Sequence, residues 1–330
     1  MKIIKIIFIF FLINVTDVFA QEKNFDEWLI SFKKKALNNQ ISETTFNKAM
    51  SDVRYLPKVI EYDRFQPEFY EDTITYIGKR SNKRKIKKGL SVYNKNKVLI
   101  DKVEKKFLVE KELLLALMGI ETNFGTYLGK MDIISSLATL SFDKRRSEFF
   151  TNELITILQL IEEGIIEHDV LFGSWAGAFG NFQFMPSTIR KYAIDYNLNN
   201  VIELKKNDDS FASAANYMNK IGWKKNEPCF IKVNLKKNIP SKFLNTSAKK
   251  IINKKRFSYF DQYIVNFDKD IDRNLLVGII TPDKDIIPDA LTLDPAYLVF
   301  ENYELILKWN RSLRFALAVC TLKESFKNEL

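Results

Sequence analysis

A helix that carries an acidic residue on its apolar face is the feature of this sequence that most restricts its fold. Across residues 111–121, apolar side chains recur at spacings of three and four, the period of a helix with one buried face. Positions i, i+3, i+4 and i+7 of that face are Leu114, Leu117, Met118 and Glu121. The helix must therefore pack against a core while it holds a carboxylate on the packed side.

The carboxylate of Glu121 has two explanations. Desolvation raises the pKa of a carboxyl group that faces a core and keeps it protonated near neutral pH. A protonated carboxylic acid at the edge of a cleft is what glycosidic-bond cleavage requires. Alternatively, Glu121 turns to solvent at the helix end, where residues 122–125 (TNFG) interrupt the helix. The pattern alone leaves both explanations open.

Residues 174–188 (SWAGAFGNFQFMPST) combine several features of a saccharide-binding groove. The small residues allow a ligand to approach the backbone, and the aromatic residues, Phe184 among them, offer faces that stack on sugars. Gln183 can donate and accept hydrogen bonds, and Pro186 suits the first turn of a helix. A close helix crossing, in which the glycines serve packing only, explains the same residues equally well.

The remaining pattern predicts a mainly helical (α+β) protein. Helical periodicity dominates from Phe25 to about Met118 and is interrupted at residues 62–69. Further helices are expected over residues 147–163, 186–196 and 312–326. Beyond Pro228 the helical period fades, and two short runs, 230–233 and 275–280, are typical of strands.

Composition excludes several classes of protein. The chain has 330 residues and is 46% apolar, which suffices for packed cores and excludes disordered and fibrous proteins. Its two cysteines, Cys229 and Cys320, cannot build a disulfide framework; one disulfide and two buried thiols both stay open. His168 is the only histidine, which disfavours histidine-based metal sites and Ser-His-Asp catalysis.

The N-terminus predicts export. Lys2 and Lys5 precede an apolar run over residues 6–13, which is shorter than the roughly 20 residues of a membrane span. Val18 and Ala20 provide the small residues of a cleavage site, and no cysteine follows that could carry a lipid. We expect a signal peptide over residues 1–20 and a periplasmic protein without a lipid anchor. An uncleaved anchor is the alternative.

The net charge of +10 indicates an anionic polymer as partner. For an exported protein, an anionic cell-wall polymer or acidic lipid is favoured over nucleic acid. The densest basic run is residues 79–88 (KRSNKRKIKK), which is either an electrostatic footprint or a solvated helix face. We assign it no specific role from the sequence.

Four ordered motifs resemble the bacterial lytic murein transglycosylase B family. They are residues 119–125 (GIETNFG), 174–188, 215–217 (ANY) with 222–223 (GW), and 309–312 (WNRS) with 315–319 (FALAV). The resemblance begins near Phe25, includes residues 63–69 and runs almost to the C-terminus. It implies a lysozyme-like core with an N-terminal helical domain and a small inserted β-rich subdomain, in an enzyme that cleaves the glycan of peptidoglycan.

The resemblance also implies the order of the domains. A helical domain is expected over residues 21–107 and the first part of the catalytic core over residues 108–227. The β-rich insert would cover residues 228–292, and the C-terminal part of the core residues 293–330.

By position, the resemblance makes Glu121 the single catalytic acid and base. It assigns substrate binding to Ser174, Gln183, Phe184, Tyr217, Trp309 and Asn310. Arg145 and Arg146 match a basic pair that meets carboxylates of the peptide stem, with a solvated surface pair as the alternative. Trp309 and Phe315 stand where better-known members have tyrosine, so we expect stacking to persist and hydroxyl hydrogen bonds to be lost.

A single carboxylate implies a particular reaction, because glycosidases ordinarily use two. Glu121 would protonate the oxygen between N-acetylmuramic acid and N-acetylglucosamine. Its anion would then deprotonate the muramoyl 6-hydroxyl, which attacks C1 and leaves a 1,6-anhydromuramoyl end.

Two other functions are hypotheses. A hydrolytic muramidase would need a second carboxylate, and Asp132 and Asp143 are the nearest in sequence. The other alternative is a non-catalytic peptidoglycan-binding protein. In each case we expect a monomer whose partners are peptidoglycan strands, with other cell-wall enzymes as candidate partners and no nucleic acid.

Residues 195–209 resemble a calcium-binding loop that has lost some of its ligands. Asp195, Asn197 and Asn199 place oxygen side chains at positions one, three and five of an EF-hand-like loop, and Asp209 lies further on. Asn200 replaces the turn glycine, and Lys206 stands in place of the bidentate glutamate. We therefore expect no cofactor and no tight calcium binding.

Overall fold

The computed structural model describes residues 24–66, 70–265, 271–284 and 293–330. The signal peptide expected over residues 1–20 lies outside the described residues. The described chain divides into two compact units. The first unit consists of residues 24–64, 128–191 and 198–203, and the second of residues 65–127, 192–197 and the described residues from 204 to 330.

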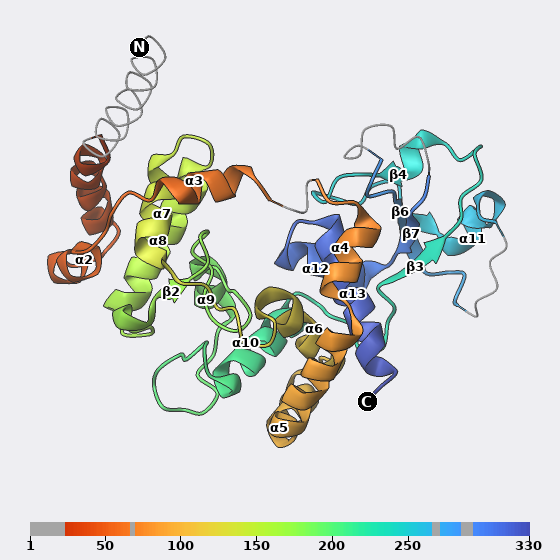
Figure 1. Cartoon of the computed structure of the whole chain (residues 1–330), viewed down its shortest axis with the longest axis horizontal. Helices are drawn as coiled ribbons and strands as arrows, with labels where there is room; N and C mark the ends of the chain where they lie inside the picture. The colour runs from red at the N-terminus through yellow and green to blue at the C-terminus, as the bar shows by residue number, and fades with distance from the viewer. Residues whose placement is uncertain (1–23, 67–69, 266–270, 285–292) are drawn as a thin grey trace, which may run out of the picture. The chain divides into compact units, whose positions relative to one another are not determined.

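The first unit is built from helices. Residues 24–38 form its first helix. The others are α2 (Glu43–Met50), α3 (Pro57–Arg64), α7 (Ile133–Phe142), α8 (Ser147–Glu162), η2 (His168–Val170) and α9 (Pro186–Tyr192). The α7 and α8 helices pack side by side (Figure 1), and α7 is buried continuously from Ile133 to Ser141. An apolar helix of this kind is stable only inside a core.

A short antiparallel ladder closes this unit. β1 (Met131–Asp132) pairs with β2 (Phe172–Gly173), with Met131 opposite Gly173. The Asp132 side chain also accepts from the Ser135 amide at 2.6 Å and so begins α7. Gly129 approaches so closely that a Cβ there would lie 2.0 Å from the Gly173 carbonyl oxygen, and its φ is +84°. Only glycine fits this turn.

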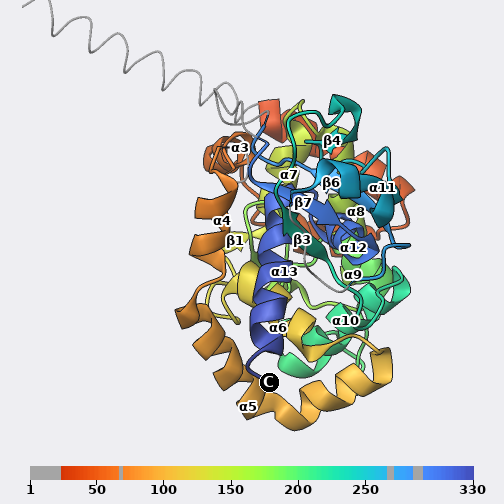
Figure 2. The same cartoon turned by 90° about the vertical axis from the view of Figure 1, so that its right-hand side faces the viewer.

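The second unit is organised around its C-terminal helix. Its helices are α4 (Thr73–Arg80), α5 (Lys83–Phe107), α6 (Lys111–Thr122), α10 (Asn207–Lys220), η3 (Ser241–Phe243), α11 (Phe257–Phe260), η4 (Asp261–Tyr263), α12 (Glu301–Trp309) and α13 (Leu313–Lys327). The α13 helix packs against α4, α5, α6 and α12, and Figure 2 shows it beside α6. Its residues from Leu313 to Cys320 are all buried, so it provides the core for its neighbours.

The long helix α5 bends in its middle. Asn96 has non-helical dihedral angles (φ −121°, ψ 19°), and the bend is visible in Figure 2. The Asn96 side chain donates to the Val92 carbonyl at 2.9 Å and accepts from Asn207 of α10 at 2.9 Å. A polar side chain that bonds into the helical ladder and to a neighbouring helix is an identifiable cause of such a kink.

The strands of the second unit form one mixed sheet. They are β3 (Phe230–Val233), β4 (Leu244–Asn245), β5 (Lys255–Arg256), β6 (Leu276–Ile280) and β7 (Ala296–Val299). The order is β3-β7-β6-β4, with β5 also paired to β6; the β4–β6 pair is parallel and the others are antiparallel. The two runs predicted as strands are thus confirmed as β3 and β6. The sheet also includes β7, which follows residue 292, where the β-rich insert was expected to end.

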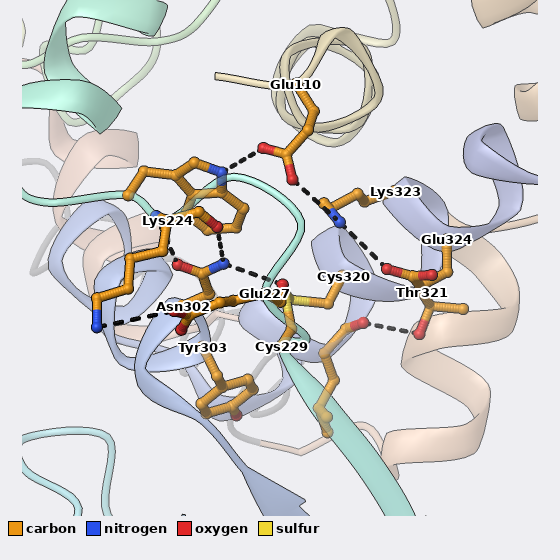
Figure 3. Close-up of a disulfide and its surroundings, with 12 residues drawn as sticks. Glu110, Lys224, Glu227, Cys229, Asn302, Tyr303, Cys320, Thr321, Lys323 and Glu324 are labelled. Carbon is orange, nitrogen blue, oxygen red and sulfur yellow. Dashed lines mark hydrogen bonds and ion pairs between the residues drawn. A yellow bond between two sulfur atoms is a disulfide. The ribbon is translucent and has the colours of Figure 1, made fainter. Parts of the chain in front are cut away.

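A disulfide ties this sheet to the helical core. Cys229 directly precedes β3, and it is bonded to Cys320 of α13 (Figure 3). Both residues are buried, at 3% and 0% exposure. Of the two states left open by the sequence, the structure has the disulfide.

Most predicted helices are confirmed as α6, α8 and α13. The helix expected over residues 186–196 instead ends at Tyr192. Side chains of α10 bind the backbone at and beyond this end, in place of further helical hydrogen bonds. Asn216 donates to the Tyr192 carbonyl at 2.8 Å, and Ser213 accepts from the Ile194 amide at 3.0 Å. Among the described residues, no helix is long and apolar enough to cross a membrane.

Candidate functional site

The α6 helix places Glu121 at the end of a buried apolar segment. Leu114, Leu117 and Met118 are buried as the sequence predicts, and Glu121 itself is half-buried in the last turn. The helix stops at Asn123, which adopts the left-handed conformation (φ 50°, ψ 49°). The carboxylate is therefore neither enclosed in the core nor fully solvated.

The indole of Trp309 holds this carboxylate. Trp309 is the last residue of α12, and its Nε1 donates to Glu121 Oε1 at 2.9 Å. The expected stacking at this position is present, because the Trp309 ring stacks on that of Tyr217, and the indole N–H adds a hydrogen bond that the sequence did not predict. A hydrogen bond to one carboxylate oxygen restricts the rotation of the group and favours its ionised form.

Two stacked tyrosine rings support the indole. The rings of Tyr217 and Trp309 lie 4.9 Å apart at 17°, and those of Tyr192 and Tyr217 lie 4.2 Å apart at 17°. The Tyr217 hydroxyl donates to the Lys308 carbonyl at 3.0 Å, next to Trp309 in the chain. Burial, with the neighbouring Tyr192, raises the pKa of Tyr217 to about 12, so the hydroxyl stays neutral at physiological pH. Tyr217 thus positions Trp309, and its expected contact with substrate stays a prediction.

Glu121 lines a cavity of about 440 Å³ that is otherwise rich in cations. The cavity is lined by Lys79, Asn82, Arg84, Lys85, Lys88, Ile120, Glu121, Thr122, Asn123 and Tyr127. Glu121 is its one carboxylate among the residues that the structure describes. Five of the lining residues come from the run 79–88, and four of these five are cationic, so the run is more than a solvated helix face. From the sequence this run had no specific role.

Two predicted binding residues serve the loop that contains them. Ser174 Oγ accepts from the amides of Ala176 and Ala178, at 3.3 and 2.9 Å. Gln183 Nε2 donates to the carbonyls of Leu128 and Gly180, at 3.3 and 2.9 Å. Both side chains are half-buried in the first unit. Their expected contacts with sugar stay predictions.

Two aromatic residues lie in the core. Phe184 is 3% exposed in the first unit and Phe315 is 4% exposed in α13 of the second. The expectation that Phe184 offers an open face to sugars was wrong, because a side chain this deeply buried has no free face. Asn310, by contrast, is half-buried at the end of α12, directly after Trp309.

Arg145 and Arg146 meet a buried carboxylate rather than solvent alone. Both guanidinium groups pair with Asp63, whose side chain is only 1% exposed. Arg145 Nε donates to Asp63 Oδ2 at 2.7 Å, and a second nitrogen donates to the Asp63 carbonyl at 2.7 Å. Each arginine is still about half exposed, so the pair lies at the surface while it binds Asp63, and its expected contact with the peptide stem stays a prediction.

The two other carboxylates considered for catalysis both have structural partners in the first unit. Asp132 caps α7, as described above. Asp143 pairs with Arg64 at 2.9 Å and accepts from the Arg145 amide at 3.4 Å. Neither lines the cavity of Glu121.

The candidate calcium loop is held by protein contacts. Asp209 is fully buried and its Oδ1 accepts from the Tyr196 amide at 2.8 Å. Asn199 accepts from the Val201 amide at 3.0 Å and donates to Glu203 at 2.9 Å. Across the described residues, no group of three or more histidine, cysteine, aspartate or glutamate side chains could hold a metal ion.

Comparison with known proteins gives a consistent picture. Residues 24–324 match the Transglycosylase SLT domain family. Over 150 residues the chain is 34% identical to the membrane-bound lytic murein transglycosylase B of Escherichia coli (strain K12). That match covers 45% of this chain and 42% of the relative, so it spans less than half the length of that protein.

Solved structures share the fold. SltB3 from Pseudomonas aeruginosa, crystallised with NAG-anhNAM-pentapeptide, is similar with a TM-score of 0.80 and 28% identity, over 92% of this chain and 79% of that one. The Escherichia coli lytic transglycosylase Slt35 in complex with calcium gives a TM-score of 0.76 at 23% identity, over 91% and 93% of the two chains. The second likeness concerns the fold alone. The expected mainly helical, lysozyme-like architecture is confirmed.

Proposed function

This chain belongs to the Transglycosylase SLT domain family, and on that premise we propose that it is a lytic transglycosylase of peptidoglycan. It cleaves the β-1,4 bond between N-acetylmuramic acid and N-acetylglucosamine and leaves a 1,6-anhydromuramoyl end. One observation carries this proposal: Glu121 is held by the Trp309 indole in a cavity where, among the described residues, it is the one carboxylate.

The reaction needs only this one group. Protonated Glu121 gives its proton to the glycosidic oxygen as the bond from that oxygen to C1 breaks. The 6-hydroxyl of the same muramoyl residue then attacks C1 and gives its proton to the Glu121 carboxylate. The proton count balances and Glu121 is regenerated. Because the nucleophile belongs to the same sugar, proximity replaces the external water.

The Trp309 indole acts at the moment when Glu121 becomes an anion. A hydrogen bond to a charged acceptor stabilises more than one to a neutral acceptor. The indole therefore assists proton transfer to the glycosidic oxygen. It also fixes the orientation of the carboxyl group by engaging Oε1.

Two alternatives remain to be tested against this proposal. A hydrolytic muramidase has little support, because Asp132 and Asp143 are each engaged by partners within the first unit. A purely binding protein has no need of a carboxylate oriented by an indole.

Several finer expectations form part of the proposal. Ser174, Gln183, Tyr217 and Asn310 bind the sugars, and Arg145 and Arg146 meet the peptide stem. The protein is exported to the periplasm without a lipid anchor, needs no cofactor and acts as a monomer. A buried disulfide agrees with an oxidising compartment.

Mass analysis of digested peptidoglycan tests the reaction. Purified peptidoglycan should yield muropeptides that are one water lighter than hydrolysis products. Glu121→Gln keeps the shape of the site and removes the transferable proton, so turnover should fall at least about a hundredfold while glycan binding persists. Glu112→Gln, in the first turn of the same helix, is the matched control and should retain turnover. Reducing muramic acid ends as the main product would favour the muramidase, and binding without cleavage would favour the binding protein.

A further inference from the structure

The cavity that contains Glu121 has a cationic wall. We use this name for Arg84, Lys85 and Lys88, which lie in the first two turns of α5 and line the cavity. Lys79, at the end of α4, also lines the cavity but is paired with Glu71 at 2.5 Å. The wall therefore presents three positive charges beside the proposed acid.

No described carboxylate neutralises the cationic wall. Lys85 Nζ donates to the Gly119 carbonyl at 2.7 Å, and Lys88 donates to the Thr126 hydroxyl. Both acceptors are neutral, and Arg84 is exposed with no ion pair to a described residue. Burial, with repulsion from Arg80 and Lys88, lowers the pKa of Lys85 to about 8. Positive charges crowded in this way favour the arrival of an anion.

The cationic wall is fixed relative to Glu121 by close packing. Gly89, the next residue after Lys88, lies so near α13 that a Cβ there would be 2.2 Å from the Phe326 ring and 2.8 Å from the Phe124 ring. Phe124 follows Glu121 by three residues and is itself buried. The contact from Lys85 to Gly119 joins α5 directly to α6, the helix that carries Glu121. Charges held by rigid elements make a preorganised site rather than a mobile surface fringe.

We propose that the cationic wall binds a carboxylate of the peptide branch attached to the muramoyl residue at the scissile bond. This inference rests on the proposed function. The N-acetylated sugars are neutral, so the glycan alone offers nothing for three cations to bind. The carboxylates of the substrate lie on its peptide branches, and a lactyl carboxylate is free only where the peptide is missing. A peptide carboxylate on the wall would place the glycosidic bond near Glu121 and make peptide-bearing strands the preferred substrate.

Calorimetric binding in a Glu121→Gln background tests this inference without turnover. The probes are a disaccharide-peptide with free peptide carboxylates, the same molecule with those carboxylates converted to amides, and the disaccharide with a free lactyl carboxylate. The free peptide should bind about tenfold more tightly than the amidated one. The pair Arg84→Gln and Lys88→Gln should abolish this difference, and Arg84→Gln alone, at an exposed position, should reduce it.

The control is on the same helix. Lys83 and Lys87 are exposed and do not line the cavity, so Lys83→Gln with Lys87→Gln removes the same charge from another face. This control should keep the tenfold preference. Equal losses in both double variants would show a general effect of net charge and overturn the inference. So would equal binding of the free and amidated peptides, or a preference confined to the lactyl carboxylate.

The result is separable from the proposed function. If peptidoglycan digestion gives no anhydro products while the cationic wall still discriminates the peptide carboxylate, the reaction is wrong and the carboxylate site stands. If anhydro products appear and the wall variants bind both peptides alike, the reaction stands and the carboxylate site is wrong.

Discussion

Replacing Trp309 by phenylalanine removes the indole N–H that donates to Glu121 and leaves an aromatic ring to stack on Tyr217. The lost bond is 2.9 Å long and half-buried, so it is a full hydrogen bond. A bond to a neutral acceptor contributes about 1 kcal/mol and one to a charged acceptor about 1.5–3 kcal/mol. Only the difference, about 0.5–2 kcal/mol, acts as Glu121 gives up its proton. We therefore expect kcat to fall about two- to thirtyfold in Trp309→Phe.

The pH dependence supplies a second readout. The indole favours the ionised carboxylate, and the reaction begins from the protonated form. Removing the indole therefore lets Glu121 keep its proton to higher pH, and the alkaline limb of the pH–rate profile should move upward. A loss of packing alone would lower the rate without moving this limb.

The matched control is Trp223→Phe. The Trp223 indole also donates to a carboxylate, that of Glu110, but both residues are buried away from the cavity (Figure 3 shows Glu110). This variant should lose stability and keep the pH–rate profile of the wild type. Muropeptide release followed by chromatography gives kcat, and thermal unfolding shows which fraction is folded. A Trp309→Phe enzyme within twofold of wild-type kcat, with an unshifted profile, would refute the role of the indole.

Further predictions concern stability, pH, calcium and export. Replacing Cys229 and Cys320 by alanine should lower the free energy of unfolding by about 2–4 kcal/mol in urea titrations, because the bond closes a long loop across 91 residues of sequence; an unchanged midpoint would contradict this. The pKa of Lys85 is lowered from 10.5 to about 8, so between these values the unfolded chain binds more protons than the folded chain. The contribution of Lys85 to stability should therefore rise with pH across this window, and Lys85→Met should flatten that slope in denaturant titrations at several pH values. Calcium titration by calorimetry should detect no micromolar binding, because Asp209 is already engaged by a backbone amide, and micromolar affinity would overturn this expectation. Intact-mass measurement of periplasmic protein should find cleavage after Ala20, and a chain that retains Met1 would contradict it.

Local patterns in the sequence predicted the features that depend on local periodicity. The stripe of Leu114, Leu117 and Met118 is buried as its spacing requires. The short runs that became β3 and β6 carry their own strand signal. In both cases residues close together in the sequence carry the signal, as a helical stripe in α6 and as a continuous apolar run in β6.

Contacts between distant segments had no such signal. Trp309 and Glu121 are 188 residues apart, and no local sequence pattern near either residue predicts the hydrogen bond between them. The same holds for Cys229 and Cys320, which required the sheet and α13 to come together. The aromatic content of residues 174–188 was informative, but the direction of Phe184 into the core was set by tertiary packing.

The basic run 79–88 was predictable in part from local periodicity and in part not. Arg84 and Lys88 are four residues apart and line the cavity, while Lys83 and Lys87, also four apart, are exposed outside it. Helical phase could have divided the run into these two pairs. Which pair lines the cavity of Glu121 depends on the packing of Gly89 against Phe326. No local sequence pattern contains that information.

In the proposed reaction the muramoyl 6-hydroxyl, and not water, attacks C1 after Glu121 protonates the leaving oxygen. Digestion of purified peptidoglycan in water enriched in a heavy oxygen isotope tests it most directly. The new muramoyl ends should carry no heavy oxygen, because water takes no part in the proposed reaction. Heavy oxygen at C1 of those ends, in proportion to the enrichment of the water, would contradict it and identify the protein as a hydrolase.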